Sequence, residues 1–314
     1  MTILITGAAG FVGSHLIDFL QSNTGDIIYS SVLNEQEAST VRLEKDKIKI
    51  ADITNAKQVD ALIEEVRPNV VYHLAAQSSV GNSWKIPALT YSINIVGTTN
   101  LLESLKKYEL QSTKVLLIGS AEQYGTIKPE ELPVTEEHAL TAANPYSISK
   151  VTQEMLAKMY VKSCGMDITM VRAFNHIGPG QNTNFVIPDW CSQIVKIEKG
   201  EQEPILKVGN ISVKRDFTDV RDIVRAYYLL SQKGKAGEVY NVGTGKSLSL
   251  EDILNVMKEL SVHDSVSVEI DPDKLRPADI PELIADVSKL KEATGWEPQF
   301  HVKDTIGDIL NSMR

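Results

Sequence analysis

Apolar residues occur in the N-terminal half of the chain as short runs, separated by longer stretches in which they recur every three or four positions. Runs rich in Val and Ile predict β-strands, and the longer stretches predict helices between them. The expected strands span residues 2–6, 26–32, 47–51, 69–74, 113–118 and 167–172. Several of them are almost continuously apolar, which is typical of a parallel sheet covered by helices on both faces. The pattern therefore predicts an α/β fold with a doubly wound, mostly parallel sheet.

The pattern changes after about Pro188. Helices, loops and isolated strands follow, and one more apolar strand at residues 238–242 can return to the edge of the sheet. Prolines punctuate the last part of the chain, but apolar residues continue between them, so ordered loops are expected there. We expect a first domain over residues 1–174, with residues 215–243 returning to it, and a smaller interleaved α/β region over residues 175–314.

The composition is that of a globular protein with a large core: 314 residues, 42% hydrophobic and 23% charged. The net charge is −9 and the basic residues are scattered, which argues against a nucleic-acid-binding surface. No apolar run reaches the roughly 18 residues of a membrane span, and we identify no export signal. The isolated Cys164 and Cys191 predict free thiols without a disulfide or a metal site. We therefore expect a soluble, cytoplasmic protein.

Three glycines stand where the first strand ends and a helix begins. Gly7, Gly10 and Gly13 are spaced Gly-x-x-Gly-x-x-Gly. The first permits a tight turn, the second lets the backbone approach a pyrophosphate, and the third allows close packing of helix on sheet. The N-terminus of the helix, at Phe11 and Val12, then directs N–H groups at the phosphates. Strand, turn and helix in this order predict a dinucleotide-binding Rossmann fold, whereas isolated glycines indicate only a turn.

The end of the second strand bears on the choice of dinucleotide. A Rossmann fold that prefers NAD usually has an acid there, about 20 residues after the glycines, which binds the ribose hydroxyls. Residues 29–34 read Tyr-Ser-Ser-Val-Leu-Asn, without an acid, and no arginine occurs before Arg42. The sequence therefore favours NADP(H), with NAD(H) as the alternative.

Two further segments follow predicted strands at their carboxyl ends. Asp52 and Ile53 follow the third strand, and Leu74, Ala75 and Ala76 follow the fourth. These positions are expected beside the adenine and the nicotinamide ribose, where small residues permit close approach. Alternatively, Asp52 caps a helix and the alanines only pack.

A second motif predicts proton-transfer chemistry. Asn144 and Pro145 are suited to the N-cap and the first position of a helix that carries Tyr146 and Lys150. Tyr146 and Lys150 are one turn apart on one face. An ammonium beside a phenol favours the phenolate, so Tyr146 can exchange a proton with a substrate oxygen while Lys150 also reaches the nicotinamide ribose. Tyr-x-x-x-Lys often occurs by chance, but here it follows a nucleotide-binding half.

Other candidate groups come near the ends of the fifth and sixth strands. Ser120 is expected to hydrogen-bond the reacting oxygen beside Tyr146, or else to cap a turn. Glu122 is either a catalytic acid or base or a loop carboxylate. His176 is expected to face the same crevice, and no histidine has the spacing of a metal ligand.

The glycine turn, Ser120 and the Tyr146–Lys150 pair together extend over much of the chain, which resembles the extended short-chain dehydrogenase/reductase family. Residues 174–181, 214–220 and 275–280 read FNHIGPGQ, KRDFTDV and LRPADI. They are similar to the subgroup acting on GDP-linked 6-deoxyhexoses, which includes GDP-mannose 4,6-dehydratase and GDP-4-keto-6-deoxy-D-mannose reductase.

The resemblance also implies a substrate site. In this site, Asn175 contacts the substrate, and Phe185 and Val186 line the base site. Arg215 and Arg276 bind the diphosphate or the nucleotide sugar. The planar guanidinium suits phosphate oxygens. Each arginine can alternatively form an ion pair with one of the aspartates nearby in the sequence, Asp216, Asp219 or Asp279.

The choice of reaction depends on which acids follow the serine. A 4,6-dehydratase removes the C5 proton and protonates the departing C6 hydroxyl, and often uses an Asp-Glu pair there. This chain has Ala121 before Glu122, although GDP-mannose dehydratases also manage with one glutamate. Residues 187–190 lack the basic residues of the dehydratase pattern, and the chain is short for that group.

We therefore expect a reductase that moves hydride from NAD(P)H to C4 of a GDP-4-keto-6-deoxyhexose, giving GDP-D-rhamnose or its C4 epimer. The dehydratase with tightly bound NADP is the main alternative, and a C4 epimerase is a third. A non-catalytic NAD(P)-binding sensor is an alternative of another class, which the retained Tyr146 and Lys150 disfavour. Helices expected at residues 96–108 and 146–163 correspond to those that pair across a dimer in the family, so a homodimer is expected unless the same faces pack inside the monomer.

Overall fold

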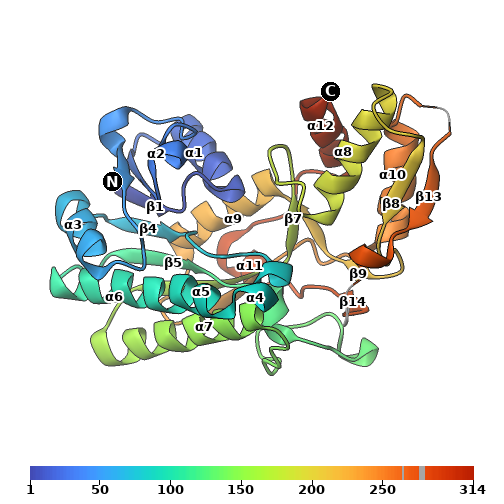
Figure 1. Cartoon of the computed structure of the whole chain (residues 1–314). Coiled ribbons are helices and arrows are strands. Elements are labelled where there is room, and N and C mark those ends of the chain that lie inside the picture. The colour runs from blue at the N-terminus through green and yellow to red at the C-terminus, as the bar shows by residue number, and fades with distance from the viewer. Residues whose placement is uncertain (264, 276–279) are drawn as a thin grey trace.

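A seven-stranded parallel sheet lies at the centre of the computed structural model, which describes residues 1–263, 265–275 and 280–314 (Figure 1). The strand order is β11-β6-β5-β4-β1-β2-β3. The doubly wound sheet expected from the apolar runs is confirmed, and each predicted strand lies within one residue of its expected ends. The bounds are β1 Thr2–Thr6, β2 Ile27–Val32, β3 Ile48–Ile50, β4 Val70–His73, β5 Lys114–Ile118, β6 Ile168–Ala173 and β11 Val239–Val242.

Helices cover both faces of this sheet, as Figure 1 shows. Successive residues of β1 point to opposite faces, so Ile3 and Ile5 enter one core and Leu4 enters the other. This explains why the strands are apolar without alternation. One face is covered by α1 (Phe11–Asn23), α9 (Val220–Lys233) and α11 (Ser288–Thr294), and the other by α3 (Ala56–Val66), α6 (Gly97–Lys107) and α7 (Pro145–Cys164).

Both helices expected from the sequence are present, and further helical turns precede the first of them. Asn144 caps α7, since its Oδ1 accepts a hydrogen bond from the Ser147 N–H at 2.8 Å, and Gly165 ends it in a left-handed conformation. The helix expected at residues 96–108 is α6, but it continues a longer helical segment. That segment contains α4 (Val80–Lys85), α5 (Pro87–Tyr91) and a π-helical turn, η2 (Ser92–Val96).

A third core lies under the C-terminal part of the chain and contains the buried thiol of Cys191. It is built by α8 (Val186–Glu198), α10 (Leu250–Leu260), α12 (Val302–Met313) and the paired strands β8 (Ile205–Val208) and β13 (Ser267–Ile270). Two small sheets lie between this core and the large sheet. They pair β7 (Asn175–Ile177) with β10 (Phe217–Asp219), and β9 (Lys214–Arg215) with β12 (Leu248–Ser249) and β14 (Glu282–Leu283).

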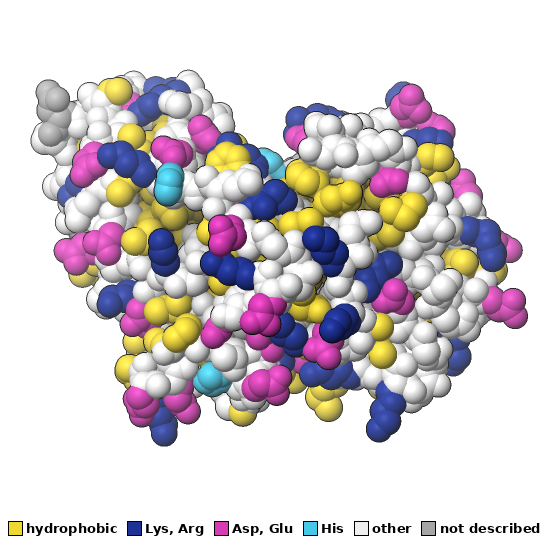
Figure 2. Space-filling model, turned by 180° about the vertical axis from the view of Figure 1, so that it is seen from behind, with side chains coloured by type: hydrophobic (Ala, Val, Ile, Leu, Met, Phe, Trp, Pro, Cys, Tyr) yellow, Lys and Arg dark blue, Asp and Glu magenta, His cyan; other side chains and the backbone are white. Residues whose placement is uncertain are grey.

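The chain crosses between the two parts more than once. Residues 214–219 pair with strands of the small sheets, whereas α9 and α11 pack on the large sheet and β11 joins its edge beside β6. Seen from behind, the surface has a notch between the two parts (Figure 2). None of the helices in the described ranges is long and apolar enough to cross a membrane. The remaining short elements are α2 (Glu35–Ala38), η1 (Lys45–Lys47), η3 (Ala121–Tyr124), η4 (Pro129–Glu131) and η5 (Pro272–Lys274).

Candidate active site

The candidate residues come together because the strands that precede them are parallel. β1, β4, β5 and β6 are neighbours or near neighbours in one sheet, so their carboxyl ends lie at the same edge. In open α/β sheets this edge is where ligands bind. The segments that follow these strands begin at Gly7, Leu74, Gly119 and Phe174. Each of them was singled out from the sequence.

The glycine turn is packed too closely against its neighbours for side chains. Gly7 has a φ of +69°, and a Cβ there would lie 2.7 Å from the Ala75 Cα. A Cβ at Gly13 would lie 2.6 Å from the Ala8 carbonyl oxygen. Gly10 is the N-cap of α1 and brings no side chain of its own to the first N–H groups. The turn therefore fits the close approach of a pyrophosphate to backbone N–H groups.

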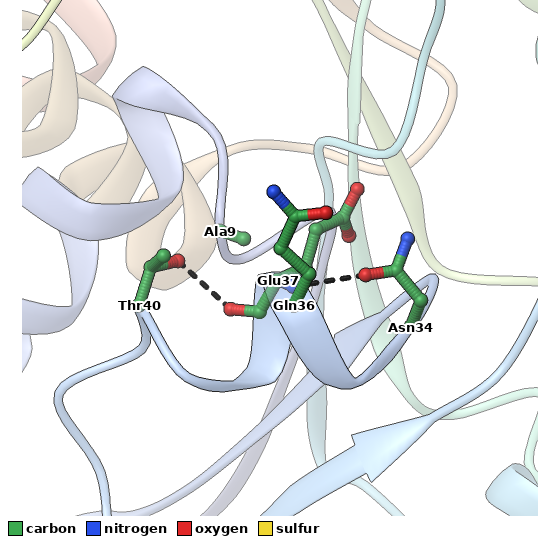
Figure 3. A pocket seen from close by; sticks show the side chains of 5 residues that line it. All are labelled: Ala9, Asn34, Gln36, Glu37 and Thr40. Carbon is green, nitrogen blue, oxygen red and sulfur yellow. Dashed lines mark hydrogen bonds between the residues drawn. The ribbon is translucent and has the colours of Figure 1, made fainter.

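A pocket of about 340 Å³ lies between this turn and α2 (Figure 3). It is lined by Ala9, Asn34, Gln36, Glu37 and Thr40, and none of these five is basic. Asn34 Oδ1 accepts a hydrogen bond from the Glu37 N–H at 2.9 Å, and Glu37 Oε2 accepts one from the Leu33 N–H at 2.8 Å. β2 itself ends without an acid, as the sequence indicated, but Glu37 supplies a carboxylate just beyond it.

The other expected cofactor contacts lie on the same edge. Asp52 Oδ1 accepts hydrogen bonds from the N–H and the hydroxyl of Thr54, at 2.8 and 2.7 Å, so this oxygen has a structural role. Ile53 packs against Gly97, because a Cβ added at Gly97 would lie 2.7 Å from the Cγ2 atom of Ile53. Ala75 N–H donates to Thr6 Oγ1 at 3.3 Å, and the half-buried Leu74 and Ala76 flank it. Their contact with a dinucleotide stays a prediction.

Tyr146 and Lys150 lie on one buried face of α7. Their exposed fractions are 8% and 4%. The Lys150 ammonium nitrogen lies 5.9 Å from the centre of the Tyr146 ring and donates to the Ile118 carbonyl at 2.8 Å. The Ser120 side chain lies close enough to the Tyr146 phenol to lower its pKa. The structure thus brings together the three groups that the sequence placed in two distant segments.

Burial sets the protonation of these groups. Burial raises the pKa of Tyr146 to about 12, and the negative charge of Glu122 acts in the same direction. The side chain of Ser120 acts in the opposite direction and lowers this pKa. Burial also lowers the pKa of Lys150 to about 7. The sequence suggested that Lys150 would favour the phenolate, but in this arrangement burial dominates. Tyr146 is therefore protonated at neutral pH, as a proton donor must be.

Glu122 is the carboxylate nearest to this group in the chain. It is half-buried, and its Oε2 accepts a hydrogen bond from the side-chain amide of Asn144, the N-cap of α7, at 3.2 Å. Ala121 is buried and packs with Tyr124 and Phe174 in a separate apolar cluster. A second acid at position 121 would be buried among apolar side chains, so the Asp-Glu arrangement is absent here.

A buried polar network behind Lys150 was not evident from the sequence. His73 Nδ1 lies 2.8 Å from Thr6 Oγ1, and its Nε2 lies 3.0 Å from Thr98 Oγ1. Gln153 Nε2 donates to the same Thr98 hydroxyl at 2.6 Å. Asn94, in the π-helical turn, donates to Ser149 Oγ at 2.8 Å. These contacts join the ends of β1 and β4 to α7, and no spacing in the sequence predicts them because each spans two distant segments.

Substitution of His73 by Gln is expected to make the protein less sensitive to acid. Burial and, to a smaller extent, the nearby charge of Lys150 lower the pKa of His73 from its ordinary value of 6.5 to about 3. The contribution of the neutral, buried imidazole to the free energy of unfolding is fully present above pH 6.5 and is lost as the pH falls toward 3. The unfolding free energy measured by urea titration should fall less between pH 7 and pH 4 in His73→Gln, by on the order of 2 kcal/mol. Equal decreases in both proteins would contradict the neutral, buried histidine.

The residues implied for the substrate occupy two elements beyond β6. Asn175 begins β7 and is exposed, whereas His176 stacks on Phe11, with ring centres 6.1 Å apart. Burial lowers the pKa of His176, whose Nδ1 lies 3.0 Å from the Phe174 carbonyl oxygen. The half-buried Val186 begins α8. The expected contact of Asn175 and Val186 with a substrate stays a prediction, and His176 also has a packing role.

Of the two arginines implied for the substrate, the structure describes Arg215. Arg215 is 9% exposed, and its guanidinium donates to the carbonyl oxygens of Lys214 and Ile280 at 2.8 and 2.7 Å. It therefore helps to join β9 to the chain before β14, and binding of a phosphate by it stays a prediction. Arg276 lies outside the described residues.

Known proteins that are similar to nearly the whole of this chain include enzymes named for GDP-linked sugars. Residues 4–309 match the family described as GDP-mannose 4,6 dehydratase. The GDP-6-deoxy-D-mannose reductase of Pseudomonas aeruginosa is 34% identical over 98% of this chain and 96% of its own length. The GDP-6-deoxy-D-talose 4-dehydrogenase of Aggregatibacter actinomycetemcomitans is 32% identical over 96% of this chain and 93% of its own length. A solved structure of RMD from Pseudomonas aeruginosa complexed with NADPH is 32% identical, with a TM-score of 0.87 over 100% of this chain and 99% of that one.

Proposed function

The chain belongs to the GDP-mannose 4,6-dehydratase family of extended short-chain dehydrogenases, and from this premise we propose that it reduces the 4-keto group of a GDP-4-keto-6-deoxyhexose. As a member of this family it is an enzyme of the NAD(P)-dependent oxidoreductase type. The proposed product is GDP-D-rhamnose or its C4 epimer. Both stereochemistries occur in the names of the similar proteins, a 6-deoxy-D-mannose reductase and a 6-deoxy-D-talose dehydrogenase.

The proposed reaction assigns each buried polar group a task. When bound, the reduced nicotinamide supplies the hydride that C4 receives. Tyr146 gives its phenolic proton to the oxygen at C4, because burial keeps that proton in place at neutral pH. Ser120 hydrogen-bonds the same oxygen, and Lys150 stabilises the phenolate that remains. The keto group becomes an alcohol, with one hydride and one proton added.

The absence of basic residues at 187–190 carries the choice of a reductase over a GDP-mannose dehydratase. The acids of the site bear only on a dehydratase with an Asp-Glu pair. The site pairs a protonated Tyr146 with a single carboxylate, Glu122, which a hydrogen bond from Asn144 already restrains. Position 121 is occupied by Ala121, which belongs to an apolar cluster, so this position supplies no second acid. Elimination of the C6 hydroxyl needs both a base at C5 and an acid at C6, whereas ketone reduction needs only a proton donor.

The experiment is to incubate protein stripped of nucleotide with GDP-4-keto-6-deoxy-D-mannose and reduced nicotinamide, and to identify the product by NMR. Stoichiometric oxidation of the nicotinamide together with a 4-hydroxy product is expected. Conversion of GDP-mannose into a 4-keto sugar without added reductant would instead establish the dehydratase. Interconversion of two 4-hydroxy sugars with no net oxidation would establish an epimerase.

The cofactor can be proposed more narrowly from the pocket beside the glycine turn. The absence of an acid at the end of β2 favoured NADPH, yet the pocket contains the carboxylate of Glu37 and no basic side chain among its five lining residues. A ribose 2′-phosphate would meet like charge there, whereas Asn34 and Glu37 can hydrogen-bond a ribose diol. NADH is therefore our proposed preference, contrary to the sequence-based expectation.

Replacement of Glu37 by Arg is expected to tighten NADPH binding about tenfold, since a charge-assisted hydrogen bond replaces a repulsion. Dissociation constants of NADH and NADPH would be measured by the quenching of protein fluorescence. Glu35→Arg adds the same charge change on the same short helix outside the pocket lining, and serves as the control. Tighter NADPH than NADH binding by the unsubstituted protein, or equal effects of both variants, would reject this preference.

We also propose a homodimer formed through α7 and the helices beside it. Exposed apolar side chains of Trp84, Leu89, Ile148, Met155 and Met159 lie on α4, α5 and α7, which pack side by side. Monomeric proteins seldom leave such a stripe uncovered, and a second copy of the same face would bury it.

A charge on this stripe is expected to yield monomers. Met155 is 65% exposed, so Met155→Glu should not disturb the fold but would place a carboxylate inside the dimer contact. Light scattering after gel filtration gives the mass. Val262→Glu, at a position 74% exposed in the C-terminal part, is the matched control and should remain dimeric. A monomeric unsubstituted protein would refute the dimer.

A further inference from the structure

The turn that carries Ser120 is held by the side chain of Gln123. The Ser120 N–H donates to Gln123 Oε1 at 2.8 Å, and the Gln123 N–H donates to the Ser120 carbonyl oxygen at 3.1 Å. Gln123 is fully buried, and its amide oxygen lies so close to Gly119 that a Cβ there would collide with it. The Ser120 hydroxyl caps the same turn by accepting from the Glu122 N–H at 3.2 Å, so its position depends on this turn and on how the Gln123 amide is oriented.

Glu154 fixes that orientation. Gln123 Nε2 donates to Glu154 Oε2 at 2.9 Å, and because an amide has its donor and acceptor on opposite branches, its oxygen is then directed at Ser120 N–H. Glu154 lies on α7 one turn after Lys150, on the helix that carries Tyr146. A single carboxylate thus connects the helix with the proton donor to the turn with the serine.

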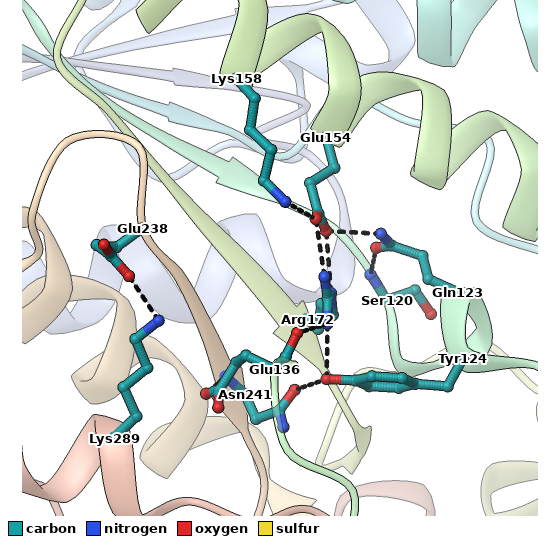
Figure 4. A network of polar contacts seen from close by, with 10 residues as sticks. All are labelled: Ser120, Gln123, Tyr124, Glu136, Glu154, Lys158, Arg172, Glu238, Asn241 and Lys289. Atoms are coloured by element: carbon teal, nitrogen blue, oxygen red, sulfur yellow. Dashed lines mark hydrogen bonds and ion pairs between the residues drawn. The ribbon is translucent and has the colours of Figure 1, made fainter. Parts of the chain in front are cut away.

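The carboxylate is itself held rigidly, as Figure 4 shows. Arg172 binds it with two parallel hydrogen bonds, at 2.9 and 2.8 Å, and Lys158 donates at 2.7 Å. The side chains of Arg172 and Glu154 are 3% and 6% exposed. Burial opposes the ionised form, but Arg172 still holds the pKa of Glu154 below its usual value.

Arg172 also secures the other end of the turn. Its NH1 donates to the Tyr124 hydroxyl at 2.9 Å, and that hydroxyl donates to Asn241 Oδ1 at 2.6 Å. The turn is therefore fixed at Gln123 and at Tyr124, the two residues after Glu122. A buried ion pair is costly to desolvate and is weak evidence for stability alone, whereas its two fixed branches give precise orientation.

We propose that Gln123 and Glu154 are positioning residues that set the distance between the Ser120 hydroxyl and the Tyr146 phenol during proton transfer. The inference rests on the proposed function, because it takes Ser120 and Tyr146 as the groups that act on the substrate. It assigns a role to the buried Gln123 and Glu154, to which Arg172 is bound, and none of the three has a task in the proposed reaction itself.

The test is a double-mutant cycle with Ser120. Gln123→Met keeps the size of the side chain and removes both hydrogen bonds, and we expect kcat to fall about 10- to 100-fold with little change in KM. In a Ser120→Ala background the same substitution should cost no further activity, because the group it positions is gone. An equal loss of kcat in both backgrounds, or no loss in either, would overturn the proposal.

An added charge provides an independent arm. Gln123→Glu places two carboxylates together and should reduce kcat more than Gln123→Met does. A loss of kcat no greater than that of Gln123→Met, in a protein whose circular dichroism and melting are normal, would contradict the proposal.

Crystal structures of Gln123→Met and of the unsubstituted protein give a readout that needs no turnover. Displacement of the Ser120 hydroxyl from Tyr146 by about 1 Å or more is expected, since offsets of this size are enough to impair catalysis. An unmoved hydroxyl would overturn the positioning role. If the unsubstituted protein does not turn over the 4-keto sugar, the proposed function fails while this structural arm still decides the role of Gln123.

Discussion

Replacing Tyr146 with Phe is expected to lower kcat about 1000-fold, within the range of general acid catalysis, while KM and the cofactor dissociation constant change little. The substitution removes only the phenolic oxygen of a side chain that is 8% exposed, so the fold should be retained. The loss arises because the oxygen formed at C4 no longer receives a proton from a positioned donor. Steady-state oxidation of the reduced nicotinamide measures it.

Tyr108→Phe is the matched control for this experiment. It removes the same oxygen from the residue that follows α6, where the hydroxyl donates to Glu64 at the surface, and should leave kcat unchanged. Unchanged turnover in Tyr146→Phe would mean that another group donates the proton. If no turnover is found in either protein but dinucleotide binding is intact, the non-catalytic sensor becomes the better hypothesis.

The second large effect is expected from Gly7→Ala, which should weaken dinucleotide binding at least about 100-fold. The φ of +69° and a Cβ 2.7 Å from the Ala75 backbone force the turn to move, and the backbone N–H groups then no longer meet the pyrophosphate. Strain at such a position costs about 1–3 kcal/mol of stability. Fluorescence titration with NADH and thermal unfolding measure the two effects.

Gly25→Ala is the control, because a Cβ at Gly25 meets no other atom within 4 Å. It should change neither the melting temperature by more than a few degrees nor the dissociation constant. If Gly7→Ala is destabilised but binds NADH normally, the turn is structural and the dinucleotide site lies elsewhere.

Much of the fold could be predicted because its signals are local. A strand buried on both faces is apolar at most of its positions, without alternation, so β1 and β4 are recognisable from their own residues. The turn at Gly7 follows β1 directly, and the cap Asn144 precedes α7 directly. Parallel pairing then brings the ends of these strands to one edge, which is why the candidate site could be assembled in outline.

Local patterns said less about the chemistry of that site. The π-helical turn that buries Asn94 has no distinctive residue pattern, and its contact with Ser149 joins two separate helices. Glu37 follows β2 too late to count as the expected acid, yet the path of α2 brings it into the pocket. The guanidinium of Arg215 donates to backbone carbonyl oxygens, and the residues beside it in the sequence do not predict these contacts.

The sequence by itself determined the sheet, the glycine turn and the family, since each depends on residues adjacent along the chain. Only the tertiary structure decided the protonation of Tyr146 and Lys150, because burial depends on every segment that packs around them. The same holds for Glu154, whose role follows from contacts with Gln123 and Arg172 on other elements. Pairwise contacts between distant segments leave no periodic signal, and the free energy of removing a group from water is a property of the packed molecule.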